Sequence, residues 1–171
     1  MRGLLRTVVF LVVAGVSQAA DVPASGAAVA ATDGCAGAET LFACPVKGGK
    51  EIRVCGAVGI PIWVGYTYGK PGAPDLKFPK VREDSANSFR HEERTTIQST
   101  GNVLSFDNEG VTYEVTEMMG SGGGADAEAN NFAGVYVLQG PTPLATVACT
   151  APPVSNWTRV REILEAGTFS P

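Results

Sequence analysis

This sequence has little histidine and lacks the motifs of reactive cysteines and of catalytic serines. His91 is the only histidine, which excludes a histidine-based metal centre. No Cys-x-x-Cys pair occurs, which argues against thiol exchange. No Gly-x-Ser-x-Gly elbow is present, and the charged run 90–94 around His91 is typical of a solvated surface. We therefore predict a protein without catalytic activity, cofactor or metal; a hydrolase acting through His91 is the catalytic alternative.

Long apolar runs are also missing after the first twenty residues. Val8–Val16 follows Arg2 and Arg6 and is too short to span a bilayer as a mature helix. Ser17-Gln18-Ala19 fits a small-x-small cleavage site, so residues 1–19 are predicted to be a signal peptide. No cysteine follows the run, which argues against a lipoprotein anchor. The sequence therefore predicts a periplasmic or secreted protein with no membrane span.

Positive charge is scarce in the predicted mature chain. Without Arg2 and Arg6, 11 Lys and Arg residues stand against 17 Asp and Glu residues, a formal charge of −6. This balance argues against nucleic acid as a partner, because nucleic-acid binding needs a basic face. It is compatible with a basic protein partner. The remaining chain of about 150 residues is long enough for one domain with one core.

The four cysteines predict two disulfides, because their number is even and the chain is predicted to be exported. Their spacing does not match a structural zinc site. Spacing alone leaves the connectivity open. A closed or nearly closed sheet would bring its last strand beside its first, which favours Cys44–Cys149 and leaves Cys35 to pair with Cys55.

Alternating apolar residues and turn signals predict a mainly β fold. Residues 39–57 form the best local pattern, a hairpin with Gly48-Gly49 at its turn. Further strands are predicted at residues 62–68, 75–78, 95–99, 103–106, 111–117, 135–138 and 144–149. The expected connections are a charged surface segment over 80–94, a turn at Gly101-Asn102 and a mobile loop over 118–131.

The last segment is predicted to be a helix over residues 156–166, capped by Ser155 or Asn156 and stopped at Gly167. Its apolar stripe should pack on the sheet and contains Trp157, Val160, Ile163 and Leu164. Residues 20–37 are predicted to be a flexible leader, and 38–171 a single β domain. The fold class is therefore an antiparallel sandwich or barrel of about eight strands with one C-terminal helix.

Two groups of residues that include acidic side chains could form a specific site: an ion- or phosphate-binding loop, or the carboxylate pair of a glycoside hydrolase. Each group also has a purely structural interpretation. Gly120–Gly124 with Asp126 and Glu128 lacks the lysine of a phosphate loop and has few ligands for calcium, so a flexible inter-strand loop is favoured. Glycoside hydrolysis needs two carboxylates across one cleft. The candidates are Glu92, Glu93, Glu114 and Glu117, but nothing in the sequence places two of them together.

Aromatic residues offer a binding alternative. Tyr66 and Tyr68, with Trp63 nearby, would favour protein or sugar binding if they were exposed on a rigid strand. The competing interpretation is that they fill the core or its rim.

Several short motifs occur in order: Leu41–Cys44, Gly49-Lys50, Val54-Cys55, Tyr66–Leu76 and Ala145–Cys149. In this the chain resembles a family of small exported bacterial proteins, mostly uncharacterised. That family carries an aromatic-x-Cys strand, a Gly-Lys turn, a second Cys, a Tyr-Gly-x-Pro segment and a closing strand that ends in Cys. The resemblance covers residues 39–149 and implies compartment and fold more than activity.

More distantly, the chain looks like the periplasmic lysozyme inhibitors. These are small exported β domains that place a short Ser-Gly-containing loop in the lysozyme cleft. The nearest counterpart here is Ser99-Thr100-Gly101-Asn102. The resemblance implies a lysozyme-inhibitor-like binding protein; the alternative is an envelope structural or small-ligand-binding module without catalytic activity.

Overall fold

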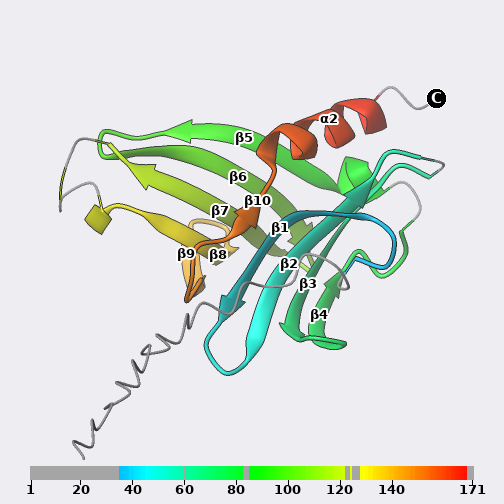
Figure 1. The fold of residues 1–171 in the computed structure, drawn as a ribbon, viewed down its shortest axis with the longest axis horizontal. Helices are drawn as coiled ribbons and strands as arrows, with labels where there is room; N and C mark the ends of the chain where they lie inside the picture. Colours follow the sequence, from blue (N-terminus) through cyan, green and yellow to red (C-terminus); the bar gives the residue numbers. More distant parts are fainter. Residues whose placement is uncertain (1–34, 60, 83–84, 122–123, 125–127, 169–171) are drawn as a thin grey trace, which may run out of the picture.

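The structure of the chain, a computed structural model, describes residues 35–59, 61–82, 85–121, 124 and 128–168. It contains two five-stranded antiparallel sheets (Figure 1). Sheet A has the spatial order β10-β1-β2-β3-β4 and sheet B the order β5-β6-β7-β8-β9. The strands are β1 (Glu39–Val46), β2 (Lys50–Ala57), β3 (Trp63–Lys70), β4 (Ala73–Phe78), β5 (Phe89–Thr95), β6 (Ser99–Asn108), β7 (Val111–Gly120), β8 (Phe132–Gln139), β9 (Thr142–Ala148) and β10 (Val154–Ser155).

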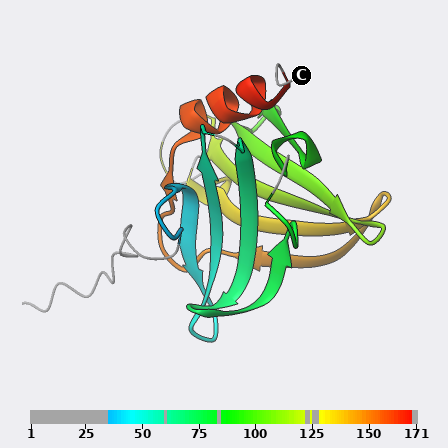
Figure 2. The same cartoon turned by 90° about the vertical axis from the view of Figure 1, so that its right-hand side faces the viewer.

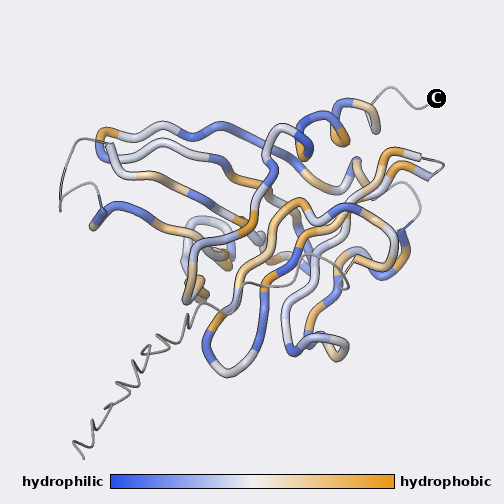
Figure 3. Tube along the Cα trace, viewed as in Figure 1, coloured by the Kyte–Doolittle hydropathy of each residue, from blue (hydrophilic) through white to orange (hydrophobic). Residues whose placement is uncertain are grey.

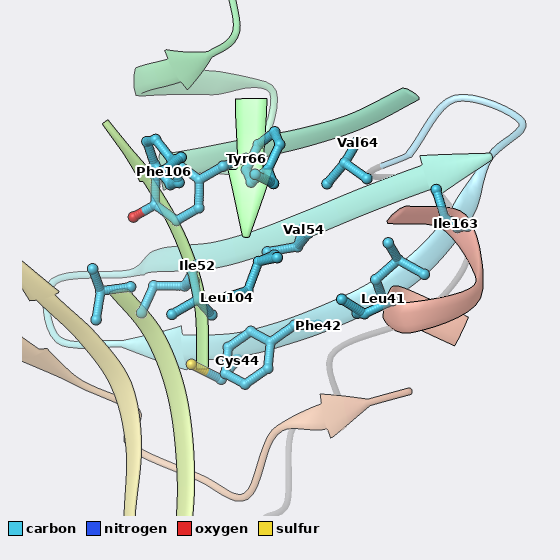
Figure 4. Close-up of a cluster of buried hydrophobic side chains, with 14 of the residues drawn as sticks. Leu41, Phe42, Cys44, Ile52, Val54, Val64, Tyr66, Leu104, Phe106 and Ile163 are labelled. Carbon is cyan, nitrogen blue, oxygen red and sulfur yellow. The ribbon is translucent and has the colours of Figure 1, made fainter. Parts of the chain in front are cut away.

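The two sheets pack through their apolar faces and form one main core (Figures 2 and 4). Sheet A contributes Leu41, Phe42, Ile52, Val54, Val64 and Tyr66, and sheet B contributes Phe89, Leu104, Phe106, Val115 and Val135. Alternation along each strand explains this division, since every second side chain points to the same face. The consecutive residues Leu41 and Phe42 are both buried because the strand register shifts between Thr40 and Phe42. Figure 3 shows apolar residues along β1, whereas β5 is mostly hydrophilic. The arrangement is sandwich-like rather than a closed barrel, so the sandwich alternative is confirmed.

Helix α2 (Trp157–Thr168) covers one end of the sandwich. The backbone N–H of Arg159 donates to Asn156 Oδ1 at 3.1 Å, so Asn156 is the predicted cap. The predicted stripe is confirmed, because Val160 and Ile163 are fully buried in the core.

Gly167 does not end α2, contrary to the prediction; it is buried inside the last turn. A Cβ on Gly167 would lie 2.7 Å from the Cβ of Ala86, which belongs to the short 3-10 helix η1 (Ser85–Ser88). Gly167 is therefore needed for the close packing of α2 against η1. In the sequence, a glycine near the end of a helix has the same pattern as a helix stop.

Both predicted disulfides are present, Cys35–Cys55 and Cys44–Cys149. The second joins β1 to the residue that follows β9, and an isolated bridge pairs Val46 with Cys149 at the same place. Two disulfides indicate an oxidising location outside the cytoplasm. Among the helices of the described part of the chain, none is long and apolar enough to cross a bilayer. The predicted signal peptide 1–19 and residues 20–34 of the leader lie outside the described residues.

Four local predictions are wrong. The charged segment 80–94 is predicted to be a surface connection, but its residues from Phe89 onward belong to strand β5 (Phe89–Thr95). The segment 95–99 is not one strand, because β5 ends at Thr95, residues 96–98 form the β5–β6 turn and β6 begins at Ser99. Gly101-Asn102 is no turn, because both residues lie inside β6 and pair with β5 and β7. The expected loop begins only after Gly120, and part of it lies outside the described residues.

Candidate functional site

Sheet B presents a row of polar side chains on its inner face, beyond the area that sheet A covers. Leu104 on β6 and Val115 on β7 are opposite each other and point into the core. Two residues further along, Asn102 lies between Glu93 of β5 and Glu117 of β7. Because side chains two apart share a face, these three point to the same side as the core residues. Thr95 and Thr100 form the next row, their hydroxyls 3.1 Å apart. We call Glu93, Thr95, Thr100, Asn102 and Glu117 the polar floor.

The start of α2 lies against this floor. The Trp157 ring packs between Phe42 of the core, with ring centroids 5.8 Å apart, and His91, 5.9 Å away. Its Nε1–H donates to Glu117 Oε2 at 2.6 Å. His91 Nε2 in turn lies 3.0 Å from Asn102 Oδ1. One indole thus connects the core, the sole histidine and the floor, which holds these side chains in fixed positions.

His91 is only partly exposed and has two ring or hydrogen-bond partners, so the expectation of a fully solvated histidine is wrong. Neither partner is a nucleophile, and the arrangement offers no catalytic triad. In the part of the chain that the structure describes, no three His, Cys, Asp or Glu side chains cluster to hold a metal ion.

The two acidic groups of the floor differ in their partners. Glu93 forms an ion pair of 3.0 Å with Arg161 of α2. Glu117 accepts the indole hydrogen bond, but no Lys or Arg in the described residues forms an ion pair with it. An indole N–H supplies a dipole rather than a full positive charge, so the negative charge of Glu117 is not neutralised locally. The floor therefore favours a cationic group at this position.

Glu117 also borders a groove of about 280 Å³. The groove lies between the ends of β7 and β8 and the segment Ala151–Pro153, which leads into β10. Its lining includes the apolar side chains Met119, Phe132, Pro152 and Pro153. A carboxylate at the border of an otherwise largely apolar groove suits a long side chain with an apolar stem and a cationic end, such as lysine or arginine.

The β5–β6 turn projects beside this groove and forms an apolar tip. Ile97 at the turn is 98% exposed, and Met119 of the neighbouring β7 is 62% exposed. In Figure 1 this end of sheet B extends past sheet A. A single exposed apolar side chain is ordinary, but two large ones at the same end of a sheet are candidate contacts for another molecule. We call Thr96-Ile97-Gln98 the hairpin tip.

Hydrogen bonds make the hairpin tip rigid. The Thr96 hydroxyl accepts from the backbone N–H of Gln98 and of Ser99, at 3.2 and 3.0 Å. The Thr96 N–H donates to the Ser99 carbonyl at 2.8 Å, and Ser121 N–H donates to the Gln98 carbonyl at 2.6 Å. Ile97 is therefore held in place on a well-bonded turn, which lowers the entropy that ordering it on binding would cost.

The predicted loop residues are divided between these features. Thr100 and Asn102 belong to the polar floor, and Ser99 closes the hairpin tip. Gly101 points to the other face, where a Cβ would lie 1.9 Å from the Glu117 carbonyl oxygen. The turn residues with the exposed apolar side chain, at 96–98, were placed in a strand by sequence reasoning.

The two tyrosines are not part of this site. Tyr66 is only 2% exposed, and burial raises its pKa well above the ordinary value of 10.0. The idea that Tyr66 is an exposed binding residue is wrong, because its ring packs against Phe106 at 5.0 Å inside the core. Tyr68 lies at the rim of the core with Lys50 5.2 Å from its ring centroid. Trp63 is also buried, in a small cluster with the Cys35–Cys55 disulfide.

The other two carboxylates considered for glycoside hydrolysis lie on the outer face of sheet B. Arg94 donates two hydrogen bonds of 3.0 Å to Glu114 and one of 2.8 Å to Glu92, and these bonds raise the pKa of its guanidinium. Glu93 and Glu117 share the inner face, separated by the β6 strand. Sequence reasoning could not select this pair, because the 23 residues between Glu93 and Glu117 do not specify the strand register.

Comparison of the chain with protein-family models, with curated proteins and with solved structures found no match.

Proposed function

We propose that this chain is a periplasmic or secreted protein that binds a basic protein through the hairpin tip and the polar floor, and that it catalyses no reaction. The single observation that carries the proposal is the position of Glu117. It is a carboxylate without a cationic partner among the described residues, at the border of a groove beside an exposed, hydrogen-bonded apolar tip.

The hairpin tip and the groove at Glu117 together have the composition of a small site for binding another protein. Ile97 and Met119 supply apolar contact area, and the groove at Glu117 supplies a position for a lysine or arginine. The net charge of the chain, −4 at pH 7, would attract a basic partner over a longer distance. Lysozyme belongs to this class of basic proteins and is the first candidate partner to test.

The test is binding of the oxidised chain to immobilised lysozyme. We expect Glu117→Gln to weaken binding at least tenfold, because it removes the charge that meets the cationic group while its amide oxygen still accepts the indole hydrogen bond. Ile97→Asp should weaken binding by a similar factor. The matched control is Glu109→Gln, which removes the same charge in the β6–β7 turn, at the opposite end of these strands from the hairpin tip.

The outcomes separate the parts of the proposal. Equal binding by wild type, E117Q and I97D would contradict the assigned site. Absence of binding to lysozyme and to other basic proteins would contradict the proposed partner class.

A second candidate function, a small-ligand or structural module of the envelope, is favoured by a different groove. This groove has a volume of about 350 Å³ and lies between η1, β5 and α2. Its lining combines Phe89 and Leu164 with His91 and Arg161. Binding of envelope extracts that survives E117Q and I97D but is lost in Arg161→Ala would favour this candidate.

A further inference from the structure

The edge of sheet B at β9 lacks the protection that the other long edges carry. An edge strand exposes unpaired backbone groups, and proteins usually protect it with charge, proline or a covering element. Edge strand β4 contains Pro74, Asp75 and Lys77. Edge strand β5 carries four charged side chains and lies against α2. By contrast, the chain from Ala129 to Thr158, which contains all of β8 and β9, has no Asp, Glu, Lys, Arg or His.

Strand β9 is also accessible. Six of its seven residues are exposed, and Val147 is half-buried against the core. Its described strand partner is β8. Just beyond its end the bridge from Val46 to Cys149 and the bond from the Thr150 N–H to the Pro45 carbonyl place the end of β1 on the same edge, so the open part of the edge ends at Ala148. Pro143 lies near the beginning of the strand, so the part from Leu144 to Ala148 has no proline or charge.

The direction of the backbone groups follows from one hydrogen bond. The N–H of Cys149, the residue after β9, donates to the carbonyl of Ala133 in β8 at 2.9 Å. Because successive N–H groups alternate along a strand, Val147 points its N–H to β8 as well. Thr146 therefore directs its N–H and C=O away from β8, toward the open edge.

We propose that two copies of this chain associate by antiparallel pairing of β9 around a two-fold axis at Thr146. The N–H and C=O of Thr146 then bond to those of Thr146 in the second copy, and Leu144 lies opposite Ala148. The two five-stranded sheets become one continuous sheet across the axis. Pairing between two threonines is favourable, and Leu144, 53% exposed in one copy, gains an apolar neighbour.

A second copy is favoured over an unrelated strand because β9 is compatible with itself. The same operation on β5, centred on Glu92, would place Glu92 opposite Glu92 and Arg90 opposite Arg94, and like charges directly opposite are destabilising. Centred on its Asp75, β4 would place two carboxylates opposite each other. Two-fold symmetry is the commonest arrangement of soluble homo-oligomers. Because β9 and the β5–β6 hairpin are at opposite edges of sheet B, this pairing leaves the hairpin tip uncovered.

The contact is small, so we expect weak association that is visible only at high concentration. The test combines sedimentation with amide hydrogen exchange by NMR on the oxidised chain, from about 10 µM to about 1 mM. We expect the dimer fraction to rise over this range. Exchange at the Thr146 N–H should slow at least tenfold as dimer forms, whereas the Val147 N–H, which bonds β8, should be protected at every concentration.

Thr146→Lys places two lysines opposite each other at the axis and should keep the chain monomeric across the range. The control is Thr158→Lys, the same substitution at an exposed position on α2. A monomer at about 1 mM would overturn the proposal, and so would a dimer in which Thr146 exchange is unchanged or one that T146K forms as readily as wild type. These outcomes are independent of binding to a basic partner, since neither E117Q nor I97D touches β9.

Discussion

At the scale of single residues, Gly101 lies where two strands approach very closely. A Cβ at this position would lie 1.9 Å from the Glu117 carbonyl oxygen and 2.7 Å from the Met118 Cα. Both atoms belong to the backbone of β7, so no side-chain rotation can relieve the clash. Glycine allows β6 and β7 to approach here, directly beneath the polar floor. In sequence the same glycine, followed by asparagine, has the pattern of a turn.

Gly101→Ala should therefore destabilise the protein by about 2 kcal/mol or more, because a backbone strand must move to make room. Urea denaturation measures the change. Gly59→Ala is the control, since a Cβ there meets no atom within 4 Å, and it should stay within about 0.5 kcal/mol of wild type. A G101A variant as stable as wild type would show that β6 and β7 are further apart than described. Because Gly101→Ala disturbs the backbone, a loss of partner binding in this variant would not show that Gly101 contacts the partner. Ile97 is therefore the better position for testing the hairpin tip.

At the scale of elements, an ion pair fixes α2 to the first strand. Arg159 binds Glu39 through hydrogen bonds of 2.7 to 3.1 Å, and these bonds lower the pKa of the Glu39 carboxyl below its ordinary value of 4.5. A lowered pKa in the folded state means that the carboxylate stabilises the fold above pH 4.5. The contribution is lost as the pH falls through the lowered value.

Glu39→Gln should lower the melting temperature at neutral pH, and the difference from wild type should shrink as the pH falls below 4.5. Thermal denaturation from about pH 3 to pH 7 measures this. Glu109→Gln is the matched control. Its carboxylate is 3.8 Å from Lys80 with both side chains mostly exposed, so its loss should change little at any pH. A Glu39→Gln effect that is constant with pH would mean that packing, not charge, carries the contact.

Most elements could be predicted because their apolar residues alternate or follow a helical stripe. Strand β5 could not, since only Phe89 of its seven residues is buried in the core. Its inner face continues into the polar floor and its outer face carries ion pairs, so the strand has no apolar alternation to detect. The two-residue β10 is too short for any pattern.

The candidate site was less accessible to sequence reasoning than the fold. Asn102 was selected, but from a resemblance to a loop that is a strand here. Glu93, Glu117 and Trp157 come from three elements, and only the strand register and the docking of α2 bring them together. Register depends on tertiary packing, which a single sequence does not specify for polar positions.

At the scale of the whole molecule, the disulfides close loops of very different length. Cys44–Cys149 joins residues 105 apart and links the first strand to the end of sheet B, whereas Cys35–Cys55 joins residues 20 apart. Restricting the unfolded chain stabilises the folded state more for a longer loop. Cys44→Ala/Cys149→Ala should therefore cost about 4.7 kcal/mol, and Cys35→Ala/Cys55→Ala about 3 kcal/mol. Urea denaturation of the two double variants gives the comparison; the reverse order would mean that native-state contacts dominate.

The central claim is that the chain binds a basic protein through Glu117 and the hairpin tip. Calorimetric titration of the oxidised chain with lysozyme, at low and at moderate salt, tests this claim most directly. A cell-wall lysis assay accompanies the titration. We predict binding that weakens as salt rises, because opposite charges draw the partners together, and slower lysis in its presence. Absence of a binding heat with several lysozymes and unchanged lysis rates would contradict lysozyme as the partner. Binding that is insensitive to salt would contradict the charge-based site at Glu117.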